Sequence, residues 1–357
     1  MFSSGILTSR DEWAYDYDFD NLKTKVICFL EDYNLEVEKW KNSSDKSEAF
    51  LNVIRKNSKL KWSDSIRKNL KKGLIHKFYD SNVRISCYRP FINKYIYFDD
   101  VVTNTKSLQS TFFPKVESTN VVIWFTIHQQ VPFVAQCSDK IIDNGISSRT
   151  SQCLPLYRYD SEGNRLENLT DWGLNQFRCH YQDNTITKEN IFHYTYAVLH
   201  HPAYRQKYAL NLKREFPRLP FYDDFHQWVA WGKQLMDLHL NYETVQKYPL
   251  KRVDKKLAAN KTNKPKLKAD KINGEIQLDA LTTLQRVPTA AWEYKLGNRS
   301  ALEWILDQYK QKKPRDKTIA EKFNTYRFAD YKETVIELLQ RVCTVSVETM
   351  EIIKKMP

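Results

Sequence analysis

The chain has 357 residues, of which 41% are hydrophobic and 28% charged, so it can bury a substantial core and has the balance of a globular protein of about two or three domains. Its six cysteines lack the close paired spacing of disulfide frameworks and zinc sites. No window of about 20 apolar residues resembles a membrane span, and the first residues lack a secretory pattern. We therefore expect a cytoplasmic protein with no metal site and no membrane partner.

The positive charge is concentrated in two short tracts. The net charge is +13, and residues 55–72 and 251–271 each carry a net +7, which leaves the rest of the chain almost neutral. Such tracts are typical of proteins that bind a polyanion, most often nucleic acid. The alternative is that both tracts are solvated segments that only add solubility.

Residues 1–82 are predicted to form a helical segment. Apolar residues recur there at helical spacing: Leu22, Val26, Phe29, Leu30, Tyr33 and Val37. A second helix can run from Asp45 through Ile54. Ser63 is a suitable N-cap for a third helix, which Gly73 would end.

Residues 83–186 are predicted to form a β-rich core. Pro90 separates two extended runs, and residues 120–127 form a continuous apolar run typical of a strand buried on both faces. The runs VPFVAQCSDKII and QCLPLYRYD add further strands, with polar connections between them.

Residues 187–250 return to helical spacing, with Thr187 as a cap and Pro202 at the first position of a new helix. Three histidines lie close together here: His193, His200 and His201. They could bind a metal or move protons, but helical spacing places them beside the apolar stripe. We interpret them as residues that pack at a corner between two helices.

The C-terminal third is predicted to begin with a basic linker or exposed loop at residues 251–271, followed by a hairpin and helices over residues 272–357. The Asn273-Gly274 pair is typical of a tight hairpin turn. Ser300 and Glu303 form a capping box, and Asp330 with Glu333 repeats that spacing before the last helix.

Polar residues in the connections of the β-rich core are candidates for reading base edges, because Asn and Gln pair with adenine and Arg or Lys with guanine in the major groove. These base-contacting candidates are Asn104, Lys106, Gln109, Gln129, Gln130, Arg149 and Gln152. Basic residues are candidates for contacts to phosphate, which set affinity without reading sequence. The phosphate-contacting candidates are Lys59, Lys61, Arg67, Lys68, Arg89, Lys94, Lys255, Lys256 and Lys266.

Two other functions fit some of the same residues. Asp279, Glu293 and Lys295 have the D…E-x-K spacing of metal-dependent nucleases, although flanking core strands are not evident. The 21 tyrosines could instead stack the bases of single-stranded nucleic acid without sequence preference. We predict no catalytic residues, because the motifs of ATPases, nucleotide-binding folds, hydrolases and adenine methyltransferases are absent.

Several segments in collinear order resemble the C-terminal target-recognition region of type ISP restriction-modification enzymes, in which one chain carries a nuclease, a helicase-like motor and an adenine N6-methyltransferase. The segments are GILTSRDEW (5–13), YRPFINKYIYFD (88–99), LPLYRYD (154–160), NIFHYTYAVLHHPAYRQKY (190–208), FPRLPF (216–221) and NRSALEWILDQY (298–309). The fourth and sixth segments are the most specific.

This resemblance implies a specificity module that recognises a double-stranded DNA sequence, while other domains or subunits methylate and cleave. We expect an α+β fold: a helical segment that adjoins a methyltransferase domain, a β-containing recognition core, and a helical C-terminal half. We expect no activity from this chain alone, because it begins just beyond the place of the methyltransferase motifs. S-adenosylmethionine, ATP and Mg would belong to the methyltransferase and helicase-nuclease partners.

Overall fold

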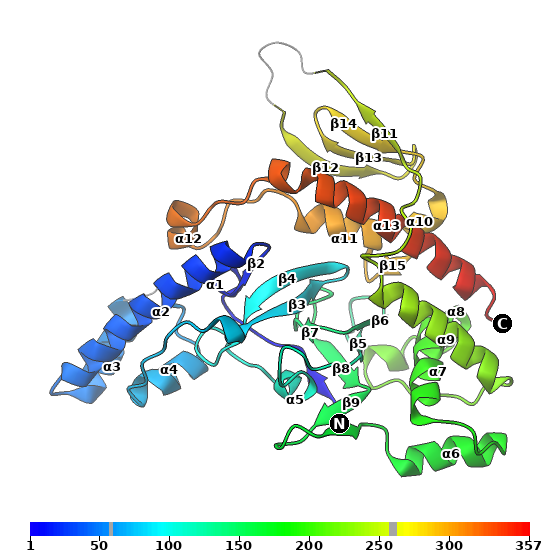
Figure 1. Ribbon diagram of the computed structural model, residues 1–357, viewed down its shortest axis with the longest axis horizontal. Coiled ribbons are helices and arrows are strands. Elements are labelled where there is room, and N and C mark those ends of the chain that lie inside the picture. Colours follow the sequence, from blue (N-terminus) through cyan, green and yellow to red (C-terminus); the bar gives the residue numbers. More distant parts are fainter. Residues whose placement is uncertain (57–59, 257–262) are drawn as a thin grey trace.

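The computed structural model describes residues 1–56, 60–256 and 263–357. Figure 1 shows a central β region with helices on two sides and a β lobe at the top of the view. The sheets are small and mostly antiparallel, and helices of up to 27 residues pack around them. The predicted α+β class is therefore confirmed.

The N-terminal helices form where their apolar spacing predicts. Helix α2 begins after Asp18, whose carboxylate accepts a hydrogen bond from the Asn21 backbone N–H at 2.8 Å. It buries Leu22, Phe29 and Tyr33. The helices of this region are α1 (Asp11–Ala14), α2 (Phe19–Asn42), α3 (Lys46–Lys56) and α4 (Asp64–Lys71), which follows the predicted N-cap Ser63.

Two four-stranded sheets form the β core. One has the order β2-β4-β3-β7 and the other β1-β8-β5-β6. Their strands are β1 (Ser3–Ser4), β2 (Tyr15–Asp16), β3 (Val83–Arg89), β4 (Ile92–Tyr97), β5 (Val122–Thr126), β6 (Val134–Ser138), β7 (Ile141–Ile142) and β8 (Ser151–Pro155). The predicted strands before and after Pro90 and the fully buried strand within 120–127 are confirmed.

The first 16 residues differ from the helical prediction. Strand β1 pairs with β8, and β2 pairs with β4, so the start of the chain belongs to both core sheets. These strands are only two residues long, which is too short to leave a period of alternating residues in the sequence.

A helical layer follows the second sheet. Thr187 caps α7 (Lys188–His200) in a capping box with Asn190, and Pro202 opens α8 (Pro202–Lys207), as predicted. Helix α7 packs on α9 (Phe225–Leu240) so closely that a Cβ added to Gly232 would lie 1.8 Å from the backbone oxygen of His193. His200 and His201 are buried where α7 meets α8, which agrees with the packing interpretation.

The basic stretch 251–271 is not a linker where the structure describes it. Its ends form β11 (Lys251–Asp254) and β12 (Pro265–Asp270), which join β13 (Glu275–Asp279) and β14 (Thr282–Gln285) in the order β11-β14-β13-β12. Leu267 is buried among exposed lysines and Ala269 packs against the core, so β12 has an apolar face although the stretch is rich in lysine. The predicted hairpin at Asn273-Gly274 is confirmed, with Asp270 paired to Glu275. Figure 1 shows this sheet as a lobe above α11 (Ala301–Gln308) and α13 (Phe328–Lys354).

The C-terminal helices attach this lobe to the rest of the molecule. They are α10 (Thr289–Glu293), α11 (Ala301–Gln308), α12 (Lys317–Lys322) and α13 (Phe328–Lys354), and a short hairpin of β15 (Lys295–Leu296) and β16 (Arg299–Ser300) precedes α11. The capping box of Ser300 and Glu303 is confirmed.

The start of α13 differs from the prediction. It begins at Phe328, and its flanking residue Arg327 makes no side-chain cap, so Asp330 does not start the helix. Glu333 instead binds Arg252 of the lobe at 2.7 Å. None of the helices in the described residues is both long and apolar enough to cross a membrane.

Candidate nucleic-acid interface

Two loops leave the same end of the sheet β1-β8-β5-β6. Strand β5 ends at Thr126, which pairs with Val134 at the start of β6 and with Ser151 at the start of β8. The loops 127–133 and 143–150 therefore meet at this end, which we call the loop edge. The Thr126 and Ser147 hydroxyl groups lie 2.6 Å apart and join the strand to the second loop.

The loop edge gathers several of the base-contacting candidates. Gln129, Gln130 and Arg149 are exposed, and Gln152 is half-buried just inside β8. The Arg149 guanidinium forms no ion pair within the described residues, and its one hydrogen bond is a long 3.5 Å contact to the Ser148 carbonyl. Exposed amides with an unpaired guanidinium are the donors and acceptors that read base edges.

A buried ion pair fixes the second loop. Asp143, at its start, accepts hydrogen bonds from Arg89 of β3 at 2.7 Å, from the Tyr15 hydroxyl at 2.9 Å and from the Gly145 backbone N–H at 2.8 Å. The Arg89 side chain is only 16% exposed and its charge is neutralised. The prediction that Arg89 contacts phosphate is therefore corrected. Its guanidinium pairs with Asp143 and supports the loop from inside the fold.

A third loop, residues 98–108, lies beside these two. The backbones of Leu7 and Thr105 exchange hydrogen bonds of 2.8 and 2.9 Å, while Ile6 bonds to Ile142 and Asn144 on its other side. Asn104 and Lys106 thus lie next to the loop edge, separated from it by residues 6–8. Asn104 donates to the Ser9 hydroxyl, and Lys106 is paired with Asp100 at 2.9 Å.

Gln109 lies inside the fold rather than in an exposed loop. It is 0% exposed at the start of α5 (Gln109–Phe112), its amide nitrogen donates to the Ser4 carbonyl, and its amide oxygen accepts from the Ile142 N–H. Because its polar atoms are used by the core, we remove Gln109 from the base-contacting candidates.

Lys94 is also held by the fold. Its ammonium lies 4.3 Å from the ring centres of both Tyr17 and Tyr88. Burial, with the nearby cations Arg89 and Lys25, lowers the pKa of Lys94 to about 7. A half-buried amine that carries only part of a charge at neutral pH is a poor phosphate ligand, so Lys94 is corrected to a packing residue.

The remaining basic candidates lie on two separate surfaces. Lys61 and Lys68 are exposed beside and on α4, with Arg67 half-buried, while Lys59 lies outside the described residues. Lys255, Lys256 and Lys266 are exposed on the lobe. Figure 1 places α4 at the lower left and the lobe at the top, so the two tracts do not merge into one patch.

The residues of the nuclease alternative are not assembled into a metal site. Asp279 is 2% exposed and is occupied by Lys332 at 2.8 Å, Asn263 at 3.0 Å and two backbone N–H groups. Glu293 is exposed at the end of α10, and Lys295 lies in the following hairpin. No cluster of three or more His, Cys, Asp or Glu suited to a metal occurs in the described part of the chain.

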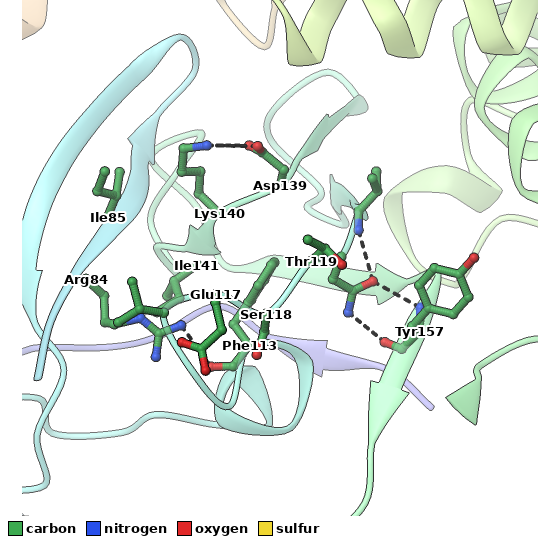
Figure 2. A pocket seen from close by; sticks show the side chains of 13 residues that line it. Arg84, Ile85, Phe113, Glu117, Ser118, Thr119, Asp139, Lys140, Ile141 and Tyr157 are labelled. Atoms are coloured by element: carbon green, nitrogen blue, oxygen red, sulfur yellow. Dashed lines mark hydrogen bonds and ion pairs between the residues drawn. The ribbon is translucent and has the colours of Figure 1, made fainter. Parts of the chain in front are cut away.

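A cavity of about 520 Å³ lies at the opposite end of β5, where Val122 pairs with Ser138 and Pro155. Figure 2 shows its polar side chains, several of which bind the protein itself. Arg84 donates to the carbonyls of Phe113 and Lys115, and Lys140 pairs with Asp139 at 2.8 Å. These groups hold the chain around the cavity and do not form a catalytic set.

Sequence reasoning missed the residue that fixes several of these segments together. Arg10 is 1% exposed and donates to the carbonyls of Val101 and Val102, the carbonyl of Lys61 and the Ser63 hydroxyl, at 2.8–3.0 Å. It joins the third loop to the start of α4. An arginine inside a charged segment gives no signal of burial, so only the fold could identify it.

Comparisons with known proteins identify the family and the fold of the chain. A family model described as "Type ISP C-terminal specificity domain" matches residues 1–338. Among solved structures, the chain is similar to DrdV in a DrdV–DNA complex, with a TM-score of 0.93 and 42% identity over 100% of this chain and 36% of DrdV. The chain thus spans about a third of the length of DrdV.

Two further structures have the same fold at lower identity. A nuclease-deletion mutant of the Type ISP restriction-modification enzyme LlaGI, in complex with a DNA substrate mimic, matches with a TM-score of 0.85 and 27% identity over 100% of this chain and 33% of that chain. The ATP-dependent Type ISP enzyme LlaBIII bound to DNA matches with a TM-score of 0.83 and 22% identity over 100% and 23%. No curated protein matches significantly in sequence.

Proposed function

The chain belongs to the family of Type ISP C-terminal specificity domains, and from this premise we propose that it recognises a specific sequence of double-stranded DNA for a restriction-modification system. The observation that carries the proposal is the loop edge, where the end of a sheet presents Gln129, Gln130 and Arg149 to solvent. The DNA complexes of DrdV and LlaGI, which share the fold across this whole chain, support it.

The two basic surfaces would bind phosphate groups on either side of the read sequence. Exposed lysines on α4 and on the lobe attract DNA at long range and release counterions on binding, which gives affinity that depends on salt but not on sequence. The loop edge would add the sequence-dependent part, at about 1–3 kcal/mol for each good bidentate contact.

Methylation and cleavage would be carried out by a methyltransferase and a helicase-nuclease, as other domains or subunits of the same system. S-adenosylmethionine, ATP and Mg would bind to those parts. DrdV and the LlaGI mutant are about three times as long as this chain, which leaves room for such domains in the complete assembly.

Binding of the purified chain to a random duplex library, to the same library as single strands, and to duplex at several salt concentrations tests this function. We expect a recovered duplex motif and weaker binding to single strands. A preference for single strands without sequence dependence would replace the proposal with the stacking alternative. Magnesium-dependent cleavage that Glu293→Ala abolishes would replace it with the nuclease alternative.

A further inference from the structure

A second cavity, of about 750 Å³, opens directly beside the loop edge. Gln130 and Phe133 of loop 127–133 form one wall, α8 and the buried end of α7 form another, and the β15–β16 hairpin with the end of α13 closes it. Its size is typical of ligand cavities in proteins. Because Gln130 belongs to both features, anything bound at the loop edge lies next to this cavity.

Arg205 brings an unneutralised charge to the cavity. Its Nε donates to the Leu199 carbonyl at 2.5 Å, which fixes the side chain, and its guanidinium lies 5.7 Å from the Phe133 ring centre. It forms no ion pair with a carboxylate in the described residues, and burial lowers the pKa of Arg205 to about 10. The side chain is half-buried and lines the cavity, so its remaining guanidinium donors are available to an acceptor bound there.

His200 lines the same cavity and keeps one ring nitrogen buried inside its wall. The side chain is 2% exposed and lines the cavity, and its Nδ1 lies 2.8 Å from the Tyr196 carbonyl. Because a carbonyl only accepts, Nδ1 carries the proton and Nε2 presents a lone pair. That Nε2 is buried and has no partner within the described residues.

The other walls separate into an apolar part and a basic rim. Pro132, Phe133, Met350 and Ile353 supply apolar surface. Lys213 and Lys295 add two cations, neither of which forms an ion pair in the described ranges, against one carboxylate, Glu293. The lining therefore combines an apolar surface, the guanidinium donors of Arg205, and excess positive charge.

We propose that this cavity binds an unpaired nucleotide, with its base against Arg205 and His200 and its phosphate at Lys213 and Lys295. A nucleobase edge offers acceptors to the free donors of Arg205, and its ring can cover the apolar surface beside Phe133. Inorganic phosphate can bind the cations but leaves the apolar wall uncovered, and an aliphatic ligand offers the Arg205 guanidinium no acceptor. The inference rests on the proposed DNA-binding function, because Gln130 places the cavity beside the bound duplex.

Calorimetric titration of the chain with the four deoxynucleoside 5′-monophosphates, the deoxynucleosides and inorganic phosphate tests the cavity itself. At least one monophosphate should bind more tightly than its nucleoside and than phosphate. Arg205→Gln should weaken the monophosphate by at least about tenfold, the loss typical of a hydrogen bond from a charged group. Lys295→Gln, at an exposed site where folding is not at risk, should weaken the monophosphate but not the nucleoside.

Lys207→Gln is the matched control, because Lys207 lies on the same short helix as Arg205 but does not line the cavity. It should leave every affinity unchanged. Absence of saturable nucleotide binding, equal binding of phosphate and nucleotide, or an equal effect of Lys207→Gln and Lys295→Gln would overturn the inference.

A duplex with one bulged nucleotide, compared with the perfectly paired duplex, separates this inference from the proposed function. The bulged duplex should bind more tightly, and Arg205→Gln should remove that gain while both duplexes still bind. If neither duplex binds, the proposed function fails. If both bind equally well to the unaltered chain, only the nucleotide cavity is refuted.

Discussion

Arg10 shows how one side chain can support a surface that it does not touch. Its guanidinium donates four hydrogen bonds to residues 61, 63, 101 and 102, and it lies 5.4 Å from the Phe29 ring centre. The Val101 and Val102 carbonyls belong to the third loop, and the Lys61 carbonyl lies just before α4. Arg10 therefore connects these two segments of the backbone. Removal of the guanidinium would leave them without this donor inside the fold.

We predict that Arg10→Met lowers the free energy of unfolding by about 3 kcal/mol or more, because several hydrogen bonds to a charged group are removed at once. Arg214→Met, at an exposed arginine, is the control and should change stability by less than about 0.5 kcal/mol. Urea denaturation of the three proteins measures the difference. An equal stability for Arg10→Met and the unaltered chain would contradict the role given to Arg10.

Individual polar residues were the part of the site that sequence predicted least well. Gln109 and Gln129 were both predicted to lie in polar connections between strands, yet Gln109 is fully buried and Gln129 is exposed. The difference arises from Ser4 and Ile142, which are distant in the chain and meet Gln109 only through β1 and β7. Local composition contains no information on such contacts.

At the scale of elements, three helices share a buried polar cluster. His239 on α9 is hydrogen-bonded to the Tyr196 hydroxyl on α7 and to the Thr349 hydroxyl on α13, at 2.5 and 2.8 Å. Burial lowers the pKa of His239 to about 3 and the pKa of His200 well below its usual value. Both histidines are therefore neutral in the folded protein.

This cluster predicts a loss of stability in mild acid. Below about pH 6.5 the unfolded chain binds protons at both histidines and the folded chain does not, so stability present above that pH is lost as the pH falls toward about 3. Each histidine contributes a slope of at most about 1.4 kcal/mol per pH unit. Urea denaturation between pH 7.5 and pH 4.5 measures the slope.

His239→Gln should reduce the slope by the contribution of one proton. Thr349→Val is the matched control, because it removes a hydroxyl bonded to His239 and keeps the imidazole. It should lower stability at every pH without changing the slope. A slope that is the same in His239→Gln and in the unaltered chain would show that His239 does not titrate on unfolding.

Elements with a strong period or a capping signal were predicted from the sequence, and elements defined by partners were not. Helix α7, with Thr187 and Asn190, and helix α11, with Ser300 and Glu303, carry their start signals locally. Strands β11 and β12 consist largely of lysine and polar residues, and they become strands because β13 and β14 supply the apolar face. Ion pairs such as Arg252–Glu333 then attach the lobe to α13.

At the scale of the whole molecule, the positive charge is divided between α4 and the lobe, which are separated in Figure 1 by the β core and the helices next to it. A duplex at the loop edge would meet these surfaces at different points of its backbone. Affinity should thus depend on both, and sequence preference on neither.

We predict that Lys255→Gln combined with Lys266→Gln weakens binding to every duplex by a similar factor. The slope of log affinity against log salt should become shallower by about 0.9 for each phosphate group that the variant no longer neutralises. Lys354→Gln removes an exposed charge at the end of α13, outside both tracts, and should leave the slope unchanged. A change in the recovered motif instead of the slope would place the lobe in base reading.

We propose that the loop edge reads the DNA sequence. Selection of bound duplexes from a random library by the unaltered chain, by Gln129→Ala and by Arg149→Ala measures this reading. Both side chains are exposed, so the variants should fold as the unaltered chain does. We expect each variant to lose preference at one or two positions of the motif, with the salt dependence of its affinity for non-specific duplex unchanged. An identical motif from all three proteins would contradict base reading by the loop edge.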